Sequence, residues 1–245
     1  MNNVQAPSLS KLDLPPHGVE ASGAVSASQA AYEALRQRII ALDLPPGAVL
    51  SRNALARQLG VSQTPVREAL QKLEQDGLIR IVPQSRTTVR RIDVKQLEET
   101  QFLRMAVESE VVSRLARGNY GDALKRPRAL VQMQASLGND IGQMELFDTL
   151  DRGFHRALFE AVGMVRVHAM LGRQLGHLAR CQRLTLPREG KMADIVTAHT
   201  AILDGIAAGE EAVAVAAMRE HLSGTIRQVP DLQKEFPDYF LPESD

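Results

Sequence analysis

The chain has 245 residues, of which 44% are hydrophobic, so it can form one large or two modest domains, and two are expected. No apolar run approaches the ~20 residues that cross a bilayer. The polar start MNNVQAPSLSKLDLPP lacks the layout of a signal peptide, so a cytoplasmic protein is expected. The single cysteine, Cys181, can form neither an internal disulfide nor a Cys-rich zinc site. Any metal must therefore use oxygen and nitrogen ligands.

The formal net charge is zero, but charge is unevenly distributed along the chain. Between Ser28 and Ile92, ten Lys or Arg residues stand against five acidic residues, so this segment carries +5 and the remainder −5. A basic module joined to an acidic remainder favours contact of the first part alone with a polyanion. On charge alone, a randomly uneven surface remains an open alternative.

The N-terminal quarter of the chain begins with a segment of low apolar content. Residues 1–26 are rich in Ser, Ala, Pro and Gly, and we expect them to form a disordered arm. After it, the spacing of Leu35, Ile39 and Leu42 predicts an amphipathic helix from Ala30 that ends before the sequence LPPG, because proline cannot continue a helix.

Two further helices and a hairpin are predicted next. One helix spans residues 52–59 and stops at Gly60. The second has Thr64 as its N-cap and Pro65 at its first position, and it ends near Gln75. The β-branched runs LIRIV and TTVRRI then flank PQSR, which predicts a two-stranded hairpin.

The rest of the chain is helical in pattern. Breaks at glycines and at Pro187 divide residues 94–229 into about six predicted helices. Residues 230–245 form a tail whose prolines prevent a long helix. The expected fold class is therefore mostly α, with a small β element only in the N-terminal part.

The stretch ALARQLGVSQTPVREALQKLEQDGL combines a helix, a tight turn and a second helix, and the hairpin would form a wing. Residues 27–92 are therefore predicted to be a winged helix-turn-helix, whose second helix enters the major groove N-terminus first. The side chains predicted to contact bases or phosphates are Arg52, Ser62, Gln63, Thr64, Arg67 and Arg86. A winged fold used for protein contacts is the alternative, which the basic charge disfavours.

The segment from LPPGAVLSRN to PQSRTTV resembles the winged helix-turn-helix of the GntR family of bacterial transcriptional regulators, particularly its FadR-type subgroup. The matching elements are PPG, LA..LGVS, TPVREAL..L...GL and PQ. Three positions depart from the family pattern: Gln63 replaces the usual arginine, Arg86 replaces a wing glycine, and SRN replaces Ser-Glu-Arg. The resemblance implies operator DNA as a partner, whereas the departures leave the preferred bases undefined.

In the C-terminal part, DRGFHRAL places Asp151 and His155 one helical turn apart, so both can point at one spot. His199 and His221 lie on the last two predicted helices, each among apolar residues. One carboxylate and three imidazoles suit a divalent ion such as Zn²⁺, Ni²⁺ or Mn²⁺. A metal-free hydrogen-bond network and a chance placement of surface histidines are the alternatives.

Residues 94 to about 227 resemble the all-helical FCD ligand-binding domain of the FadR-type subgroup. This resemblance implies that Asp151, His155, His199 and His221 hold a divalent metal. An acid usually precedes the third ligand, whereas this chain has Ala198 there, which weakens the expected support of the ligand.

The sequence FLRMAVESEVV resembles the family's first long helix and puts Arg104 near the cavity, as a clamp for the carboxylate of an effector. An exposed ion pair between Arg104 and Glu108 is the alternative. Four other residues on a possible cavity wall are expected to lie instead on a solvated face: His168, His177, Arg180 and Arg183.

The residues are compatible with three kinds of function. A metallohydrolase would need a general acid or base beside the metal, and no further Asp or Glu shares a helical face with the four residues. The sequence therefore favours a non-enzymatic regulator, in which a small organic acid bound at the metal and Arg104 modulates operator binding by a homodimer. A regulator for which the ion itself is the signal remains the alternative.

Overall fold

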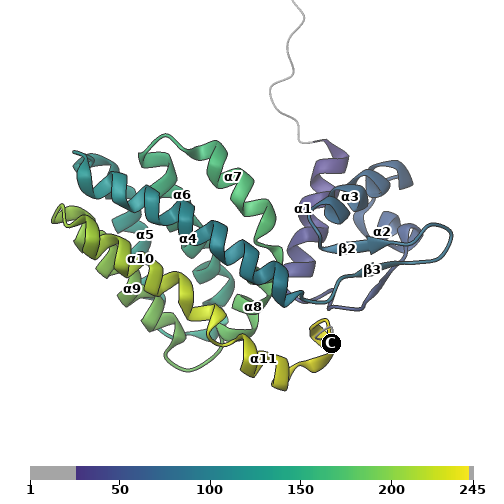
Figure 1. The fold of residues 1–245 in the computed structure, drawn as a ribbon. Coiled ribbons are helices and arrows are strands. Elements are labelled where there is room, and N and C mark those ends of the chain that lie inside the picture. The colour runs from purple at the N-terminus through teal and green to yellow at the C-terminus, as the bar shows by residue number, and fades with distance from the viewer. Residues whose placement is uncertain (1–25, 243–245) are drawn as a thin grey trace, which may run out of the picture.

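The computed structural model describes residues 26–242, and Figure 1 shows a smaller N-terminal domain beside a larger bundle of helices. The predicted arm, residues 1–26, lies outside the described residues except for Ser26. The predicted mostly α fold is confirmed, with a winged helix-turn-helix followed by an all-α domain.

Helix α1 (Ala27–Ile40) begins three residues earlier than the apolar pattern indicates. Its N-cap is Ser26, whose side chain accepts a hydrogen bond from the backbone N–H of Gln29 at 3.1 Å. The prediction that Leu42 belongs to this helix is wrong, because α1 ends at Ile40. The φ of Leu42, 66°, is left-handed, so the chain has already turned toward the two prolines.

Helices α2 (Arg52–Leu59) and α3 (Gln63–Gln75) form the predicted helix-turn-helix. Gly60 ends α2 with a left-handed φ of 65°, a conformation that costs glycine little. The predicted N-cap at Thr64 is wrong, because Ser62 has the extended backbone of the cap and α3 begins directly after it. Pro65 is tolerated in the first turn, where no intrahelical partner awaits its missing N–H.

The wing is a three-stranded antiparallel sheet of β1 (Val49–Leu50), β2 (Ile79–Ile81) and β3 (Thr87–Val89), in the order β1-β3-β2. The β2–β3 hairpin was predicted. The two-residue strand β1 was not, because it is too short to show an alternating pattern.

The N-terminal domain has its own apolar core. Leu35 and Ile39 of α1 are fully buried against Val66, Leu70 and Leu73 of α3. This packing makes α1 and the second helix of the helix-turn-helix one rigid unit.

The C-terminal domain contains one more helix than expected. Its helices are α4 (Val94–Arg117), α5 (Lys125–Leu137), α6 (Met144–Ala161), α7 (Val165–Gln174), α8 (Gly176–Thr185), α9 (Lys191–Ala207) and α10 (Glu211–Ile226). Short 3-10 turns, η1 (Gly121–Leu124) and η2 (Ile141–Gln143), flank α5. The sequence predicted α7 and α8 as one helix. The described part of the chain has no helix long and apolar enough to cross a membrane.

The bundle core is built from α4, α6, α9 and α10, with Val112, Phe154, Leu158, Ile202 and Met218 buried at its centre. Beyond α10, the predicted tail forms the short helix α11 (Val229–Glu235) and a 3-10 turn, η3 (Pro237–Tyr239). The tail then passes back beneath the domain junction, as Figure 1 shows.

Candidate metal centre and DNA-contacting surface

The structure brings together the four residues proposed as metal ligands. Asp151 and His155 come from α6, His199 from α9 and His221 from α10. Each offers one ligand atom, and these atoms all lie within 4.8 Å of one another. This convergence depends on the packing of three helices, of which α6 is distant in sequence from the consecutive helices α9 and α10.

The imidazole Nε2 atoms lie closest together. The Nε2 of His221 is 3.1 Å from that of His155 and 3.3 Å from that of His199. The Nε2 of His199 is also 3.4 Å from a carboxylate oxygen of Asp151. Polar atoms that can each present a lone pair to a common point suit a bound cation.

The opposite ring nitrogens of two histidines contact side-chain oxygens that orient the rings. The Nδ1 of His155 is 2.5 Å from a carboxylate oxygen of Glu108, and the Nδ1 of His199 is 2.9 Å from the amide oxygen of Gln134. An Nδ1–H that donates to oxygen leaves the Nε2 lone pair free for a metal. Phe154 stacks on His199 with ring centroids 3.9 Å apart, which further fixes that ring.

Electrostatics favour neutral, ligand-competent imidazoles. Burial, followed by the neighbouring His221 and His155 rings, holds the pKa of His199 well below its usual value. Burial and the neighbouring His155 and Arg104 do the same for the pKa of His221. Because a metal binds only neutral imidazole, the donor set fits a divalent cation.

Arg104 lies beside this centre rather than on the surface. Its Nε is 2.5 Å from Glu108, with only 6% and 3% of the two side chains exposed, so the expected alternative of an exposed pair is wrong. Its Nη2 is 3.1 Å from the Nε2 of His155. Burial alone would raise the pKa of Glu108, but the charges and hydrogen bonds of Arg104 and His155 together outweigh it and lower the pKa, so this carboxylate remains charged.

Glu108 also corrects the sequence argument about catalysis. We expected no further Asp or Glu on a helical face with the four residues, yet Asp148, three residues before Asp151 on α6, lines both adjoining cavities. A second carboxylate, that of Glu108, reaches His155 from α4, a different helix. Its low pKa and its two partners make it a fixed anion that holds a ring, not a group that exchanges protons. The spacing Arg-x₃-Glu was its only signal in the sequence, and Gln134 had none.

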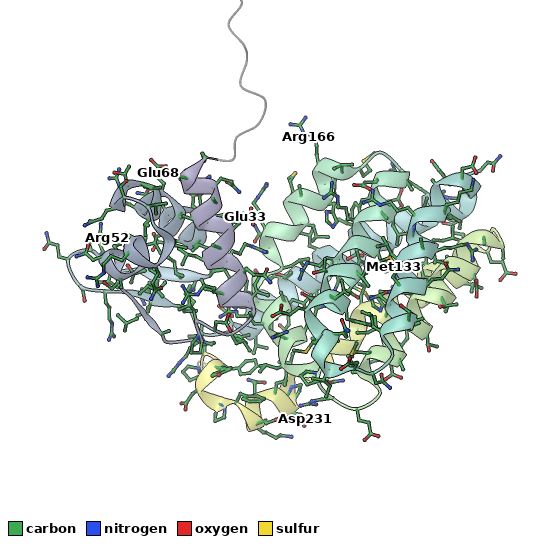
Figure 2. The ribbon with its side chains drawn as sticks, turned by 180° about the vertical axis from the view of Figure 1, so that it is seen from behind. Glu33, Arg52, Glu68, Met133, Arg166 and Asp231 are labelled. Atoms are coloured by element: carbon green, nitrogen blue, oxygen red, sulfur yellow. The ribbon has the colours of Figure 1, made fainter. Side chains whose placement is uncertain are left out.

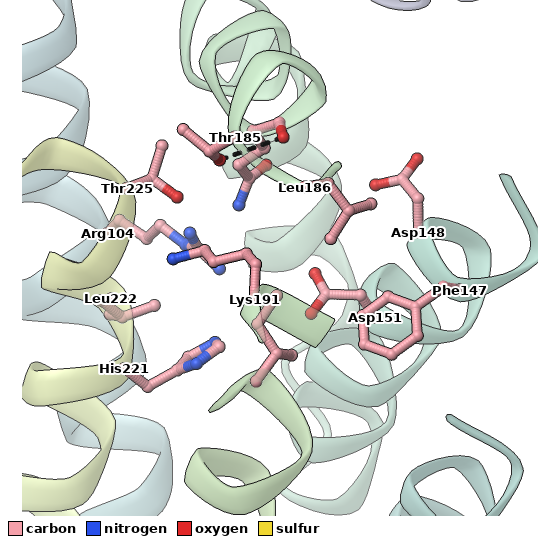
Figure 3. A pocket seen from close by; sticks show the side chains of 12 residues that line it. Arg104, Phe147, Asp148, Asp151, Thr185, Leu186, Lys191, His221, Leu222 and Thr225 are labelled. Carbon is pink, nitrogen blue, oxygen red and sulfur yellow. Dashed lines mark hydrogen bonds between the residues drawn. The ribbon is translucent and has the colours of Figure 1, made fainter. Parts of the chain in front are cut away.

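Two cavities adjoin the centre. A small one of about 40 Å³ is lined by Arg104, Asp151, Lys191 and His221, which point toward one space in Figure 3. A larger one of about 520 Å³ is lined by Arg104, Asp151 and His155 at one end. Lys191, at the start of α9, was not recognised in the sequence.

The four residues expected on a solvated face behave differently from one another. His168 is half-buried on the wall of the larger cavity, and Arg183 lies 4.0 Å from Glu145. His177 and Arg180 are 1% and 0% exposed, so a solvated face is wrong for both. They lie at the domain junction instead, where Arg180 bonds the backbone oxygen of Arg90 at 2.7 Å.

The side chains proposed to contact DNA all lie on the surface of the N-terminal domain. At the start of α3 the exposed residues are Ser62, Gln63, Thr64 and Arg67. Arg52 is exposed at the start of α2, pointing away from the domain in Figure 2, and Arg86 is exposed on the wing. The first turn of α3 is thus free to enter a groove.

Comparison with known families agrees with this two-domain arrangement. Residues 27–89 match the bacterial regulatory proteins of the gntR family, and residues 99–224 match the FCD domain. The chain belongs to the GntR family. Both matched domains and the relatives are those of transcriptional regulators. This GntR-family protein is therefore a transcriptional regulator and not an enzyme.

Relatives cover most of this GntR-family chain. An HTH-type transcriptional regulator from an unstable DNA locus of Streptomyces ambofaciens is 34% identical, covering 87% of this chain and 89% of its own. The HTH-type transcriptional repressor RspR of Escherichia coli is 25% identical, covering 88% and 94%. The solved structure of E. coli McbR/YncC has a TM-score of 0.71 at 22% identity, covering 87% of this chain and all of that one, which shows a shared fold.

Proposed function

We propose that this GntR-family regulator binds operator DNA as a homodimer and that a small carboxylic acid, held at a divalent metal in the FCD domain, modulates this binding. The observation that carries the proposal is the convergence of Asp151, His155, His199 and His221 beside Arg104. The ion would supply positive charge and open coordination positions for a carboxylate. Arg104 would then hold the carboxylate by paired hydrogen bonds.

The proposed DNA contact is the exposed N-terminal turn of α3, with Gln63 and Arg67 facing bases and the wing residue Arg86 entering the minor groove. A single helix-turn-helix binds DNA modestly, whereas a symmetric dimer contacts two half-sites about 34 Å apart. The nitrogen and oxygen donors suit a first-row divalent ion such as Zn²⁺, Ni²⁺ or Mn²⁺. A regulator for which the ion itself is the signal is the second candidate, supported by the same convergence.

His199→Ala tests the metal centre. Because the substitution removes one of four donors, we expect the metal content of the purified protein to fall from about one ion per chain to a small fraction of that. Basal operator affinity should be nearly unchanged, since α3 is in the other domain. Elemental analysis and a mobility-shift assay provide the two measurements.

His168→Ala is the matched control, because His168 lines the larger cavity but is not one of the four converging residues. It should keep the metal. Equal metal content in the wild type and His199→Ala would contradict the proposed site. Titrating operator binding with metal at fixed acid, and with acid at fixed metal, then distinguishes the two candidate signals.

A further inference from the structure

The larger cavity is shared by the two domains. One end is lined by Arg104, Asp151 and His155 of the candidate metal centre, and the other by α1 of the DNA-binding domain, including Tyr32, Glu33 and Arg36. Figure 2 shows Glu33 pointing from α1 into the space between the domains. A molecule that fills this cavity therefore touches both domains at once.

The cavity is larger than a short acid requires. Its volume is about 520 Å³, and at roughly 30 Å³ for each water-sized group it has room for about 17 heavy atoms. A three-carbon acid held at the metal centre would leave most of that space filled by water. The space fits a ligand that extends from the centre toward α1.

The charges at the α1 end favour an anion. Arg36 and Arg173 line the cavity, and neither forms an ion pair within residues 26–242. Arg36 donates to the backbone oxygen of Gly172 at 2.9 Å. The carboxylate of Glu33 accepts from Gln29 at 2.8 Å. By contrast, the cavity residues Arg104 and Arg152 each form an ion pair, with Glu108 and Asp148 respectively.

We infer that the effector is an elongated acid with two anionic ends, one held at Arg104 and the metal centre and the other at Arg36 on α1. The inference rests on the proposed function and specifies its ligand. Binding would then bridge the domains directly, without first deforming the bundle.

The contacts of α1 explain how such a ligand would affect DNA binding. α1 packs along α3 through a fully buried interface, and the Tyr32 hydroxyl donates to Asp76 at the C-terminal end of α3. A ligand that fixes α1 relative to the bundle therefore fixes α3 as well. In a dimer, this sets the distance between the two DNA-contacting helices.

The test uses metal-loaded full-length protein and straight-chain dicarboxylates from succinate to azelate, each paired with the monocarboxylate of the same length. Calorimetry measures the dissociation constants. We expect the best dicarboxylate to bind about tenfold more tightly than its monocarboxylate, or better, because it gains a charge-assisted contact. Arg36→Gln should remove that advantage and leave the monocarboxylate affinity unchanged, which also shows that the variant is folded.

Arg38→Gln is the matched control, since Arg38 lies on the same helix but bonds Gln58 of the DNA-binding domain. It should keep the advantage. If dicarboxylates bind no better than monocarboxylates, or both variants behave alike, the inference is wrong and the proposed function stands. If no acid binds the wild type, both are wrong. If Arg104→Gln retains full affinity for both acids, the role of Arg104 is wrong in the inference as well as in the proposed function.

Discussion

At the scale of single residues, Gln134 supports the ring of His199 in place of the acid that this chain lacks before that histidine. The family pattern has an acid before the third histidine, whereas this chain has Ala198, and weaker support of that ligand was expected. The structure instead shows the amide oxygen of Gln134 on α5 at 2.9 Å from the Nδ1 of His199. The support comes from another helix, so no pattern around His199 could reveal it.

Gln134→Leu should therefore weaken metal binding by about 10- to 100-fold, the usual effect of losing a hydrogen bond that orients a ligand. Gln134→Glu retains an acceptor at the same place and should retain most of the affinity. Competition with a chelator of known affinity measures both. Equal losses in the two variants would show that the side chain's volume matters rather than its oxygen.

At the scale of elements, the division between α7 and α8 shows where the sequence was insufficient. The apolar spacing continues across Leu175 and Gly176, so one long helix was predicted. In the structure, a Cβ at position 176 would lie 2.5 Å from Leu78 of the DNA-binding domain. The glycine permits a close contact between domains, and such a tertiary requirement leaves no periodic signal.

Elements with local signals were predicted better. Helix α2 matches its expected bounds because Gly60 supplies the left-handed residue that stops it. Asp151 and His155 are one turn apart on α6, so their proximity followed from spacing alone. Their meeting with His199 and His221 did not follow from spacing, because it depends on how α6, α9 and α10 pack. The residue types suggested it as one of three alternatives, and the family resemblance favoured it.

The first half of α8 holds the linker between the domains. The Nδ1 of His177 accepts a hydrogen bond from the backbone N–H of Asp93 at 3.2 Å and lies 2.9 Å from Nη2 of Arg180. Because both partners are donors, the ring must be neutral with its proton on Nε2. Burial, then the charges of Arg180 and Arg90, lower the pKa of His177 to about 3.

This neutral ring predicts a pH dependence of stability. An unfolded histidine has a pKa near 6.5, so below that pH the unfolded state binds a proton that folded His177 cannot. The contribution of neutral His177 to the free energy of unfolding is complete above about pH 6.5 and is lost progressively as the pH falls toward 3. We expect His177→Asn, which keeps an acceptor, to show a smaller fall in unfolding free energy between pH 7 and 5. Thermal denaturation at a series of pH values measures the stability of both proteins. If the stability of the wild type and of His177→Asn falls equally between pH 7 and 5, the assignment is wrong.

At the scale of the whole molecule, the end of the chain and the domain linker support one another. The N–H of Ile92 donates to the oxygen of Tyr239 at 2.7 Å, and the N–H of Leu241 donates to the oxygen of Ile92 at 2.9 Å. Ile92, Leu178, Leu232 and Phe240 form a buried cluster that joins the linker, α8, α11 and the tail. The predicted tail is thus part of the domain junction.

Phe240→Ala should destabilise the protein by about 3–5 kcal/mol, because Phe240 is 3% exposed and its removal leaves a cavity beneath the linker. Phe236→Ala, at a half-buried position four residues earlier, should cost clearly less. Chemical denaturation gives both values. Limited proteolysis should also cut the Phe240→Ala linker sooner, since loss of the cluster frees Ile92. Equal stability of the two variants would mean that the tail covers the junction without supporting it.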